Sequence, residues 1–416
     1  HNGPVSTLTP VLSSPGWELL ESLQARQGTT PVSLPELAGA LRSSGVPAEL
    51  AAAVVTQLAL RRAARAKFGP IASHMVFTRD GLEQATRLVV AARHAQRFRD
   101  AGVRRVADLG CGIGADSVAI AGLGMGVLAV DIDPEAAQAA AANLRDFDDA
   151  QVRLGDVMDL DIAELAGDGV DAIFADPARR TGAARGSSRI TDPERWSPPL
   201  SSALRWAQTI SAVGVKVAPG IAYDRIPPTW HAQWVSVGGD LVEASLWSPP
   251  LAPEGPGRSC LLLDETGAAH GISSRDGQEA NAPAEVVDVV PLGNTIAEPD
   301  PAVIRSGMLA QLARLVGAGI VSPSIAYLTG DDLPASPFYD RFEVLEVTNL
   351  RAKAISAALR TLDAGSVEIK KRGADIDPDA LRKSLKLSGV GQATVIATRV
   401  DGRHRAIVCR RLPANL

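Results

Sequence analysis

A glycine-rich segment carries the first residue types that could bind a ligand. Gly110, Gly112 and Gly114 follow the end of an apolar run. Glycine permits positive φ angles and lets the backbone approach a bound molecule closely. Asp131 ends the next apolar run, 23 residues after Asp108, which is close to the spacing at which an acidic side chain receives the hydroxyls of a ribose. The pattern predicts a site for a nucleotide-type ligand.

The spacing within this loop separates two classes of ligand. Dinucleotide sites place the third glycine three residues after the second, which seats a pyrophosphate at the start of a helix. Here the third glycine comes two residues after the second, and Asp108 precedes the loop. A carboxylate at that position would repel a pyrophosphate but attract a sulfonium or an amino group. The loop is therefore not expected to bind NAD.

Two strings resemble the class I S-adenosylmethionine-dependent methyltransferases, D-L-G-C-G-I-G at residues 108–114 and A-V-D-I-D at residues 129–133. The resemblance implies S-adenosylmethionine as the cofactor and an α/β fold with a Rossmann-like parallel sheet. It also implies that the loop surrounds the methionine part, that Asp131 binds the ribose, and that Ile132 and Asp156 contact the adenine. The expected cofactor residues are Asp108, Gly110, Cys111, Gly112, Gly114, Asp131, Ile132, Asp156 and Val157.

A candidate reaction centre follows the fourth predicted strand, in Asp176-Pro177-Ala178-Arg179. Many amine-directed members of the resembled superfamily carry Asn or Asp here, followed by two prolines and an aromatic residue. The Asp176 carboxylate could orient an amine so that its lone pair faces the methyl donor. The second proline and the aromatic residue are missing, and Arg179 could stack a base or hold a phosphate instead. The expected catalytic residues are Asp176, Pro177 and Arg179.

The polar stretch after Arg179 is rich in arginine. It could form a rim that contacts phosphates or an ordinary solvated loop, and the sequence leaves both open. Trp196 and Trp206 could form an aromatic wall, although packing in the core is the simpler role for each. The candidates for RNA contact in this stretch are Arg180, Arg185 and Arg189.

The elements around these residues alternate between strand and helix, which predicts a parallel sheet covered on both faces. A closing antiparallel pair is expected from Trp234–Trp247 and Ser259–Leu263, and a linker from about Asp264 to Pro283. The predicted strands of the main sheet are Val103–Leu109, Val127–Val130, Val152–Leu154, Val170–Ala175 and Val213–Val217, and the predicted helices begin near Asp116 and span Pro134–Leu144.

Helices also precede the sheet, because apolar residues recur at three-to-four spacing. The expected helices are Trp17–Leu23, Leu34–Leu41, Ala48–Arg65 and one continuous helix from about Asp80 to Arg99. After a helix near Ala302–Val316, an α+β module of ferredoxin-like pattern is expected, with strands and helices in the order βαβαββ. Its parts are Arg341–Val347, Leu350–Leu362, Ser366–Lys371, Pro378–Leu385, Ala393–Val400 and Arg403–Cys409.

Several distinctive strings together resemble a bacterial methyltransferase family with a C-terminal THUMP-like domain. They are Lys67–Gly69, Met75–Thr78, Gly81–Thr86, the D-P-A-R-R string and Val367–Gly373. The resemblance covers nearly the whole chain. It implies an RNA-modifying enzyme whose C-terminal domain assists RNA binding. We divide the chain into an N-terminal helical region (1–78), a methyltransferase domain (79–275) and a THUMP-like α+β domain (284–416).

The charge distribution supports an RNA partner independently of the resemblance. The whole chain has a net charge of −5, but residues 351–416 hold 14 Lys and Arg against 6 Asp and Glu, a local balance of +8. Cationic side chains that neutralise phosphates release counterions and give sequence-independent affinity. A well-solvated surface is the alternative. The candidates for RNA contact are Lys370, Lys371, Arg372, Arg382, Lys383 and Lys386.

Composition narrows the remaining possibilities. The chain has 46% hydrophobic and 21% charged residues and no apolar run long enough for a membrane span, so we expect a cytoplasmic protein without a membrane role. Its three cysteines and six histidines show no metal-ligand spacing, so neither a disulfide nor a metal is expected. Methylation of a base amine in tRNA or rRNA is the leading hypothesis. The alternatives are a small-molecule or protein methyltransferase and a noncatalytic module that binds cofactor and RNA.

Overall fold

The structure is a computed structural model that describes residues 8–27, 33–178, 190–264 and 266–413. The chain divides into two compact units. Unit 1 comprises His1–Val217 and Ser245–Glu254, and unit 2 comprises Ala218–Ala244 and Gly255–Leu416. The domain boundaries drawn from the sequence stay a prediction, and unit 2 already begins inside the predicted methyltransferase domain.

The N-terminal part of unit 1 is helical, as predicted. Val54 and Leu58 of the longest of these helices are fully buried and pack with Leu20 and Leu41 from two others. Ser33 begins the third helix, and its hydroxyl accepts a hydrogen bond from the Glu36 backbone while the Glu36 carboxylate reaches back to Ser33, a capping box that fixes the helix start. The helices are α1 (Thr9–Leu12), α2 (Ser14–Gln27), α3 (Leu34–Ser43), α4 (Ala48–Phe68) and the 3₁₀ turn η1 (Gly69–Ser73).

The continuous helix predicted from Asp80 to Arg99 is wrong, because the segment forms two helices. Helix α5 spans Arg79–Gln84 and α6 spans Leu88–Asp100. The backbone between them is extended at Ala85 and Arg87. Helical periodicity continues across the gap, so tertiary contacts must impose the break.

The sheet of unit 1 contains five parallel strands in the order β3-β2-β1-β4-β5. The end of β7 lies next to β5 in this sheet. Each predicted strand of the main sheet is confirmed to within about two residues. The carboxyl ends of parallel strands meet at one edge of a sheet, where ligands commonly bind. The strands are β1 (Arg105–Leu109), β2 (Gly126–Asp131), β3 (Ala150–Leu154), β4 (Ala172–Ala175), β5 (Ala212–Val217) and β7 (Asp240–Trp247).

Helices beside these strands pack with apolar side chains of the sheet. Phe174 of β4 stacks against Trp247 with ring centroids 6.0 Å apart, and Phe98 of α6 meets both rings edge-on. Gly214 of β5 makes room for Trp247, because a Cβ there would lie 2.4 Å from the indole. The intervening elements are α7 (Ala115–Gly122), α8 (Pro134–Leu144), η2 (Val157–Asp159), α9 (Ile162–Gly167), η3 (Pro193–Arg195), α10 (Leu200–Arg205), η4 (Trp206–Gln208) and η6 (Pro249–Leu251).

The first part of unit 2 corrects two predictions. Strand β8 (Gly257–Leu263) runs parallel to β6 (His231–Val237), not antiparallel, because the chain reverses once into β7 and again before β8. Strand β9 (Ala269–Ser273) pairs with β8 inside the predicted linker. Its residues are largely exposed, so no apolar alternation marked it as a strand. A 3₁₀ turn, η5 (Tyr223–Arg225), precedes β6.

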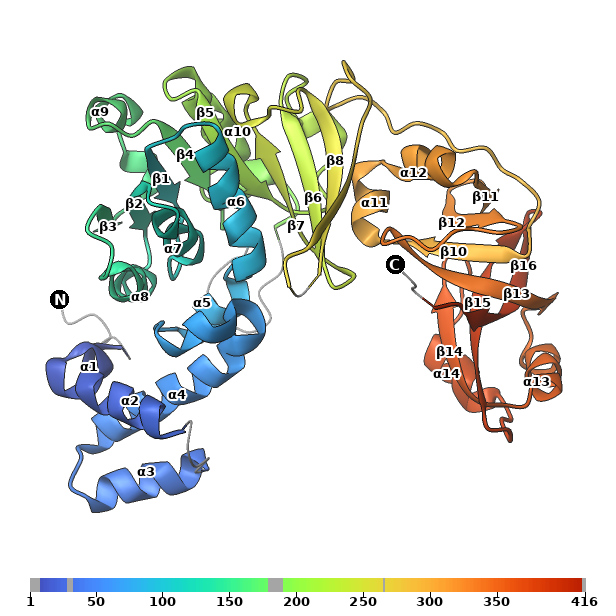
Figure 1. Cartoon of the computed structure of the whole chain (residues 1–416), viewed down its shortest axis with the longest axis horizontal. Helices are drawn as coiled ribbons and strands as arrows, with labels where there is room; N and C mark the ends of the chain where they lie inside the picture. The colour runs from blue at the N-terminus through green and yellow to red at the C-terminus, as the bar shows by residue number, and fades with distance from the viewer. Residues whose placement is uncertain (1–7, 28–32, 179–189, 265, 414–416) are drawn as a thin grey trace. The chain divides into compact units, whose positions relative to one another are not determined.

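The C-terminal part of unit 2 contains the predicted βαβαββ module, with the strand order β13-β16-β15-β14 (Figure 1). Further strands extend its sheet beyond β13 in the order β10-β12-β11. The predicted helix near Ala302–Val316 is divided at Gly307, whose φ is +79°. The elements are β10 (Thr295–Pro299), α11 (Pro301–Ser306), α12 (Leu309–Val316), β11 (Gly319–Ser322), β12 (Ile325–Gly330), β13 (Tyr339–Asn349), α13 (Ala352–Thr361), β14 (Ala364–Lys371), α14 (Pro378–Ser384), β15 (Gly391–Val400) and β16 (Arg403–Arg411).

Within the described ranges, no helix combines the length and the apolar character that crossing a membrane requires.

Candidate functional site

The glycine-rich loop connects the end of β1 to the start of α7. Gly110, Gly112 and Gly114 have φ values of +87°, +57° and +80°, a region that side chains disfavour. Gly110 also lies against the end of β4, because a Cβ there would be 2.8 Å from the Asp176 carbonyl oxygen. The structure thus brings the predicted cofactor loop and the predicted reaction centre into direct backbone contact.

The acidic residues that end β2 and follow β3 lie at the same edge. Asp131 Oδ2 accepts a hydrogen bond of 2.8 Å from the Gly112 amide, and Oδ1 accepts one from the Asp133 amide. Burial raises the pKa of Asp131. The Gly155 amide donates to the Asp131 carbonyl oxygen. This bond places Asp156, the next residue, close to the end of β2. Asp131 is therefore tied to the loop that it is expected to complete.

Four further expected cofactor residues differ in exposure. Ile132 is 63% exposed, which leaves an apolar side chain open beside Asp131. Asp156 begins η2 and accepts a hydrogen bond from the Met158 amide, and Val157 is buried. Cys111 is nearly buried, and burial raises the pKa of its thiol well above the ordinary value.

Asp108 lies beneath the loop rather than on its surface. It is only 1% exposed and accepts a hydrogen bond from the Ser117 hydroxyl of α7. Burial, reinforced by the nearby carboxylate of Asp116, raises the pKa of Asp108 to about 8. The group therefore holds a proton over a pH range in which an ordinary aspartate is ionised.

A buried polar network that the sequence analysis missed joins Asp176 to α6 and α7. Lys216 Nζ lies 2.8 Å from Asp176 Oδ2 and 2.9 Å from Thr86 Oγ1. The Thr86 side chain also hydrogen-bonds Asp116, and Asp116 Oδ1 lies 2.8 Å from His94 Nδ1. Burial opposes ionisation of Asp116, but His94 and Lys216 hold its pKa below the ordinary value. A lysine within the apolar run Val213–Val217 was the available signal.

The segment Met75–Thr78, part of the distinctive N-terminal string, is held against the cofactor loop. The Asn143 side chain of α8 bonds both the amide and the carbonyl of Val76 and also the Ile113 carbonyl. Gln57 of α4 binds the amide and the carbonyl of Phe77 in the same manner. The N-terminal region therefore packs beside the glycine-rich loop through Met75–Thr78.

The chain after Asp176 is only partly described. The Ala178 amide donates to the Ser197 carbonyl oxygen, and the Ser197 amide donates back. Trp196 is 3% exposed and its indole donates to the Ile190 carbonyl oxygen, so it packs in the core rather than forming an open aromatic wall. The predicted Arg179, Arg180, Arg185 and Arg189 lie outside the described residues.

The predicted RNA-contacting cations of unit 2 have varied surroundings. Lys370 donates to Glu298 at 2.6 Å and lies 3.4 Å from Glu368. Lys371 is exposed, and its ammonium donates to the Ile376 carbonyl oxygen. The rest of the set is Arg372, which faces Glu298 and the Tyr327 ring, Arg382, which pairs with Asp379, and the exposed Lys383 and Lys386.

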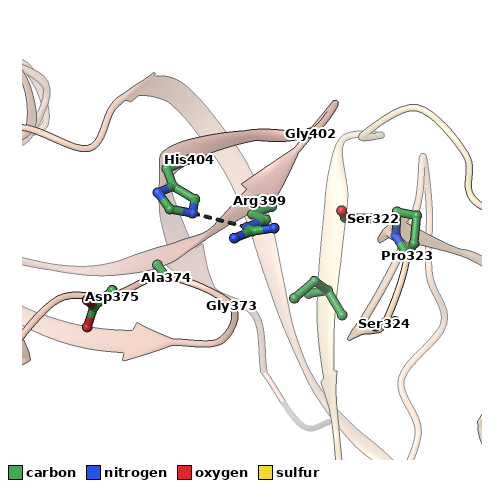
Figure 2. Close-up of a pocket in the computed structure, with 10 residues that line it drawn as sticks. Ser322, Pro323, Ser324, Gly373, Ala374, Asp375, Arg399, Gly402 and His404 are labelled. Carbon is green, nitrogen blue, oxygen red and sulfur yellow. Dashed lines mark hydrogen bonds between the residues drawn. The ribbon is translucent and has the colours of Figure 1, made fainter.

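Unit 2 also contains an open cavity of about 640 Å³. Figure 2 shows Arg399 and His404 on one side, where the Arg399 guanidinium donates to His404 Nε2 at 3.0 Å, and the turn at Ser322–Ser324 on the other. Among the residues that the structure describes, none of those expected to bind cofactor or to act in catalysis lines this cavity.

Similarity to known proteins is consistent along the chain. Residues 102–195 match the methyltransferase domain family, residues 340–411 match the THUMP domain-like family, and residues 4–64 match a domain of unknown function. A candidate methyltransferase from Porphyromonas gingivalis has a similar solved fold, with a TM-score of 0.71 and 20% identity, over 95% of this chain and 99% of that one.

A sequence relative supplies the family. An uncharacterized S-adenosylmethionine-dependent methyltransferase of Mycobacterium tuberculosis is 34% identical over 365 residues, which cover 84% of this chain and 94% of the relative. The expected cofactor and the expected fold with a C-terminal THUMP-like domain are thereby confirmed. The chain belongs to the S-adenosylmethionine-dependent methyltransferases.

Proposed function

We propose that this methyltransferase modifies RNA, at an amine of a tRNA or rRNA base, and that its C-terminal module assists RNA binding. The observation that carries the proposal is the coincidence of two features in one region. Residues 340–411 match the THUMP domain-like family, and residues 351–416 carry the local charge of +8. Positive charge of this kind attracts the phosphates of any RNA.

The loops at the edge of the unit 1 sheet fit S-adenosylmethionine. Gly110 and Gly112, whose φ angles are positive, present no side chain on the loop. Asp131 offers a carboxylate for ribose hydroxyls, and Ile132 offers an exposed apolar face for adenine. The cofactor supplies an electrophilic methyl group on a sulfonium sulfur. Asp108, Cys111, Asp156 and Val157 complete the proposed cofactor site.

Asp176 is the proposed orienting group. Its backbone contacts the cofactor loop at Gly110, so an acceptor bound to its carboxylate lies beside the methyl donor's binding loop. A carboxylate accepts a hydrogen bond from an amine and thereby directs the lone pair. Pro177 is buried and fixes the backbone that follows. Arg179 is retained as a proposed contact for the base or its phosphate.

The modified nucleosides of cellular RNA test the proposal. RNA from cells with and without the gene should differ in one methylated nucleoside by mass spectrometry, and the purified enzyme should restore it in RNA from the deletion strain. Identical nucleoside profiles in the two strains would contradict an RNA substrate.

A small-molecule or protein substrate has one observation in its favour. Several cations of the C-terminal module are engaged by carboxylates of the same seven-stranded sheet. Lys370 pairs with Glu298, and Arg411 pairs with Asp340 and Glu368. A module whose cations serve internal packing would not need RNA. Methyl transfer to protein or metabolite extracts, but not to RNA, would favour this alternative.

Replacing Asp131 by alanine should weaken the binding of S-adenosylmethionine and S-adenosylhomocysteine, and the wild type should not bind NAD. The loss should be about 1.5 to 3 kcal/mol, the range for hydrogen bonds to a charged acceptor. Calorimetry measures the affinity. Asp133→Ala is the matched control, because Asp133 begins α8 and accepts from the Glu135 amide. Unchanged affinity in Asp131→Ala would remove Asp131 from the site.

The proton on Asp108 should make the preference between cofactor and product depend on pH. S-adenosylmethionine is cationic at sulfur, whereas S-adenosylhomocysteine is not. Because the pKa of Asp108 is raised to about 8 by burial, the carboxylate attracts a cation fully only above that pH. The ratio of the two affinities should rise by about fivefold from about pH 6 to about pH 9, as expected for about 1 kcal/mol of attraction. Asp108→Asn should abolish the rise, and a flat wild-type ratio would exclude this role.

A further inference from the structure

Lys216 is a buried ammonium group at the reaction centre. It is 5% exposed and lies on β5, which pairs in parallel with β4 through Ala175 and Val215. Asp176 and Lys216 are the next residues along these two strands, and Nζ donates to Asp176 Oδ2 at 2.8 Å. Strand register therefore places the two charges side by side at the sheet edge.

A charge at this position is costly for folding. The neighbouring residues of β5, Val213, Val215 and Val217, are fully buried. Removing an ammonium from water costs several kcal/mol, and replacing buried ion pairs by apolar residues is often neutral or stabilising. Stability alone would thus favour an apolar residue at position 216. The cost is consistent with a role in the chemistry at Asp176.

Lys216 is also held by Thr86, whose segment is in turn fixed by Lys67 of α4. Lys67 of α4 donates to the carbonyl oxygens of Leu82, Glu83 and Ala85, and burial, followed by repulsion from neighbouring cations, lowers its pKa to about 8. These bonds end α5 and hold the extended segment that carries Thr86. The Thr86 hydroxyl in turn accepts from Lys216 at 2.9 Å. The break between α5 and α6 therefore places Thr86 where its hydroxyl can accept a hydrogen bond from Lys216.

We propose that Lys216 is a positioning residue for methyl transfer, which holds the Asp176 carboxylate in one orientation. Because Lys216 donates to Oδ2, the hydrogen bond from the acceptor amine falls to Oδ1. Without the ammonium, nothing would offset the repulsion between the Asp176 carboxylate and the nearby carboxyl group of Asp108. The inference rests on the proposed role of Asp176 in orienting the acceptor.

The test compares Lys216→Met, Lys216→Arg, Asp176→Asn and the double variant Asp176→Asn/Lys216→Met. Initial rates are measured with labelled S-adenosylmethionine and total RNA from cells that lack the gene. Lys216→Met should lower kcat by about 30-fold or more, as expected when a reacting group is misplaced. The cofactor KM and the affinity for S-adenosylhomocysteine should stay within about threefold, and Lys216→Arg should restore most of the rate.

The double variant shows whether Lys216 acts through Asp176. In the Asp176→Asn background, Lys216→Met should cause no further loss, because coupled residues are not additive. A wild-type kcat in Lys216→Met, or an equal loss in both backgrounds, would overturn the inference. A wild-type rate in Asp176→Asn would instead contradict the proposed role of Asp176.

Thr86→Val covers the case in which Lys216→Met does not fold, as judged by thermal melting. This variant keeps the ammonium and removes one of its hydrogen-bond partners. It should lower kcat by about threefold to tenfold without changing the cofactor KM, an effect of about one lost hydrogen bond. A wild-type kcat in Thr86→Val would count against the proposal.

Discussion

Asp176→Ala should lower the rate of methyl transfer by about 100-fold or more, while the affinity for S-adenosylhomocysteine stays within a few-fold. The expected loss is that of an electrostatic group that acts on the reacting atoms. Single-turnover assays measure it without interference from product release. Cofactor affinity should persist because Asp176 meets the cofactor loop through its backbone carbonyl oxygen, near Gly110.

Two control variants separate chemistry from folding. Asp176→Asn keeps a side-chain oxygen that can accept from Lys216 but removes the negative charge, so it should lose activity and remain folded. Asp146→Asn removes an exposed carboxylate at the end of α8 and should react at the wild-type rate. If Asp176→Ala methylates as fast as wild type, the D-P-A-R string is structural.

Reversing exposed cations of the C-terminal module should weaken RNA binding and flatten its salt dependence. Lys371, Lys383 and Lys386 are exposed. Their replacement by Glu should lower the affinity for tRNA-sized RNA by about tenfold or more and reduce the log-log salt slope by about 0.7 to 0.9 for each lost phosphate contact. Binding isotherms at several salt concentrations give both quantities. Lys370 is left unchanged, because Glu298 and Glu368 surround it.

A charge-matched control reverses three arginines of unit 1. Arg42, Arg99 and Arg153 are exposed, and their reversal changes the net charge equally. RNA affinity should stay near the wild-type value. If the C-terminal triple variant binds as tightly as wild type with the same slope, the small-molecule or protein alternative gains. Truncation after Asp300 is a poorer test, since it cuts through unit 2.

Local signals explain which elements could be predicted. Strands β1, β2, β4 and β5 are largely apolar runs, and the loop glycines need no distant partner to be noticed. The exposed β9 lacks such a pattern. Its antiparallel pairing with β8 makes it a strand, although its own sequence does not indicate one. Edge strands of this kind are decided by their neighbours.

The candidate site was predictable only in part, for a related reason. Asp108, Asp131 and Asp176 end or follow strands, so their placement at one edge follows from strand order. The partners of Asp176 come from Thr86 and Lys216, which are far away in the sequence. Periodicity across residues 80–99 favours one helix, and the contacts of Lys67 and Thr86 override it. No local pattern reports such contacts.

The close approach of Gly110 to the Asp176 carbonyl oxygen has a consequence for how substrate range can change. Any shift of the backbone at Asp176 toward Gly110 would also move the glycine-rich loop, because a gap too narrow for one methyl group separates them. Under the proposed function, a change of acceptor would therefore come from side chains after Ala178 rather than from a shift of the strand end itself. A change of acceptor would therefore leave the proposed cofactor loop intact only if the backbone contact between Gly110 and Asp176 is kept.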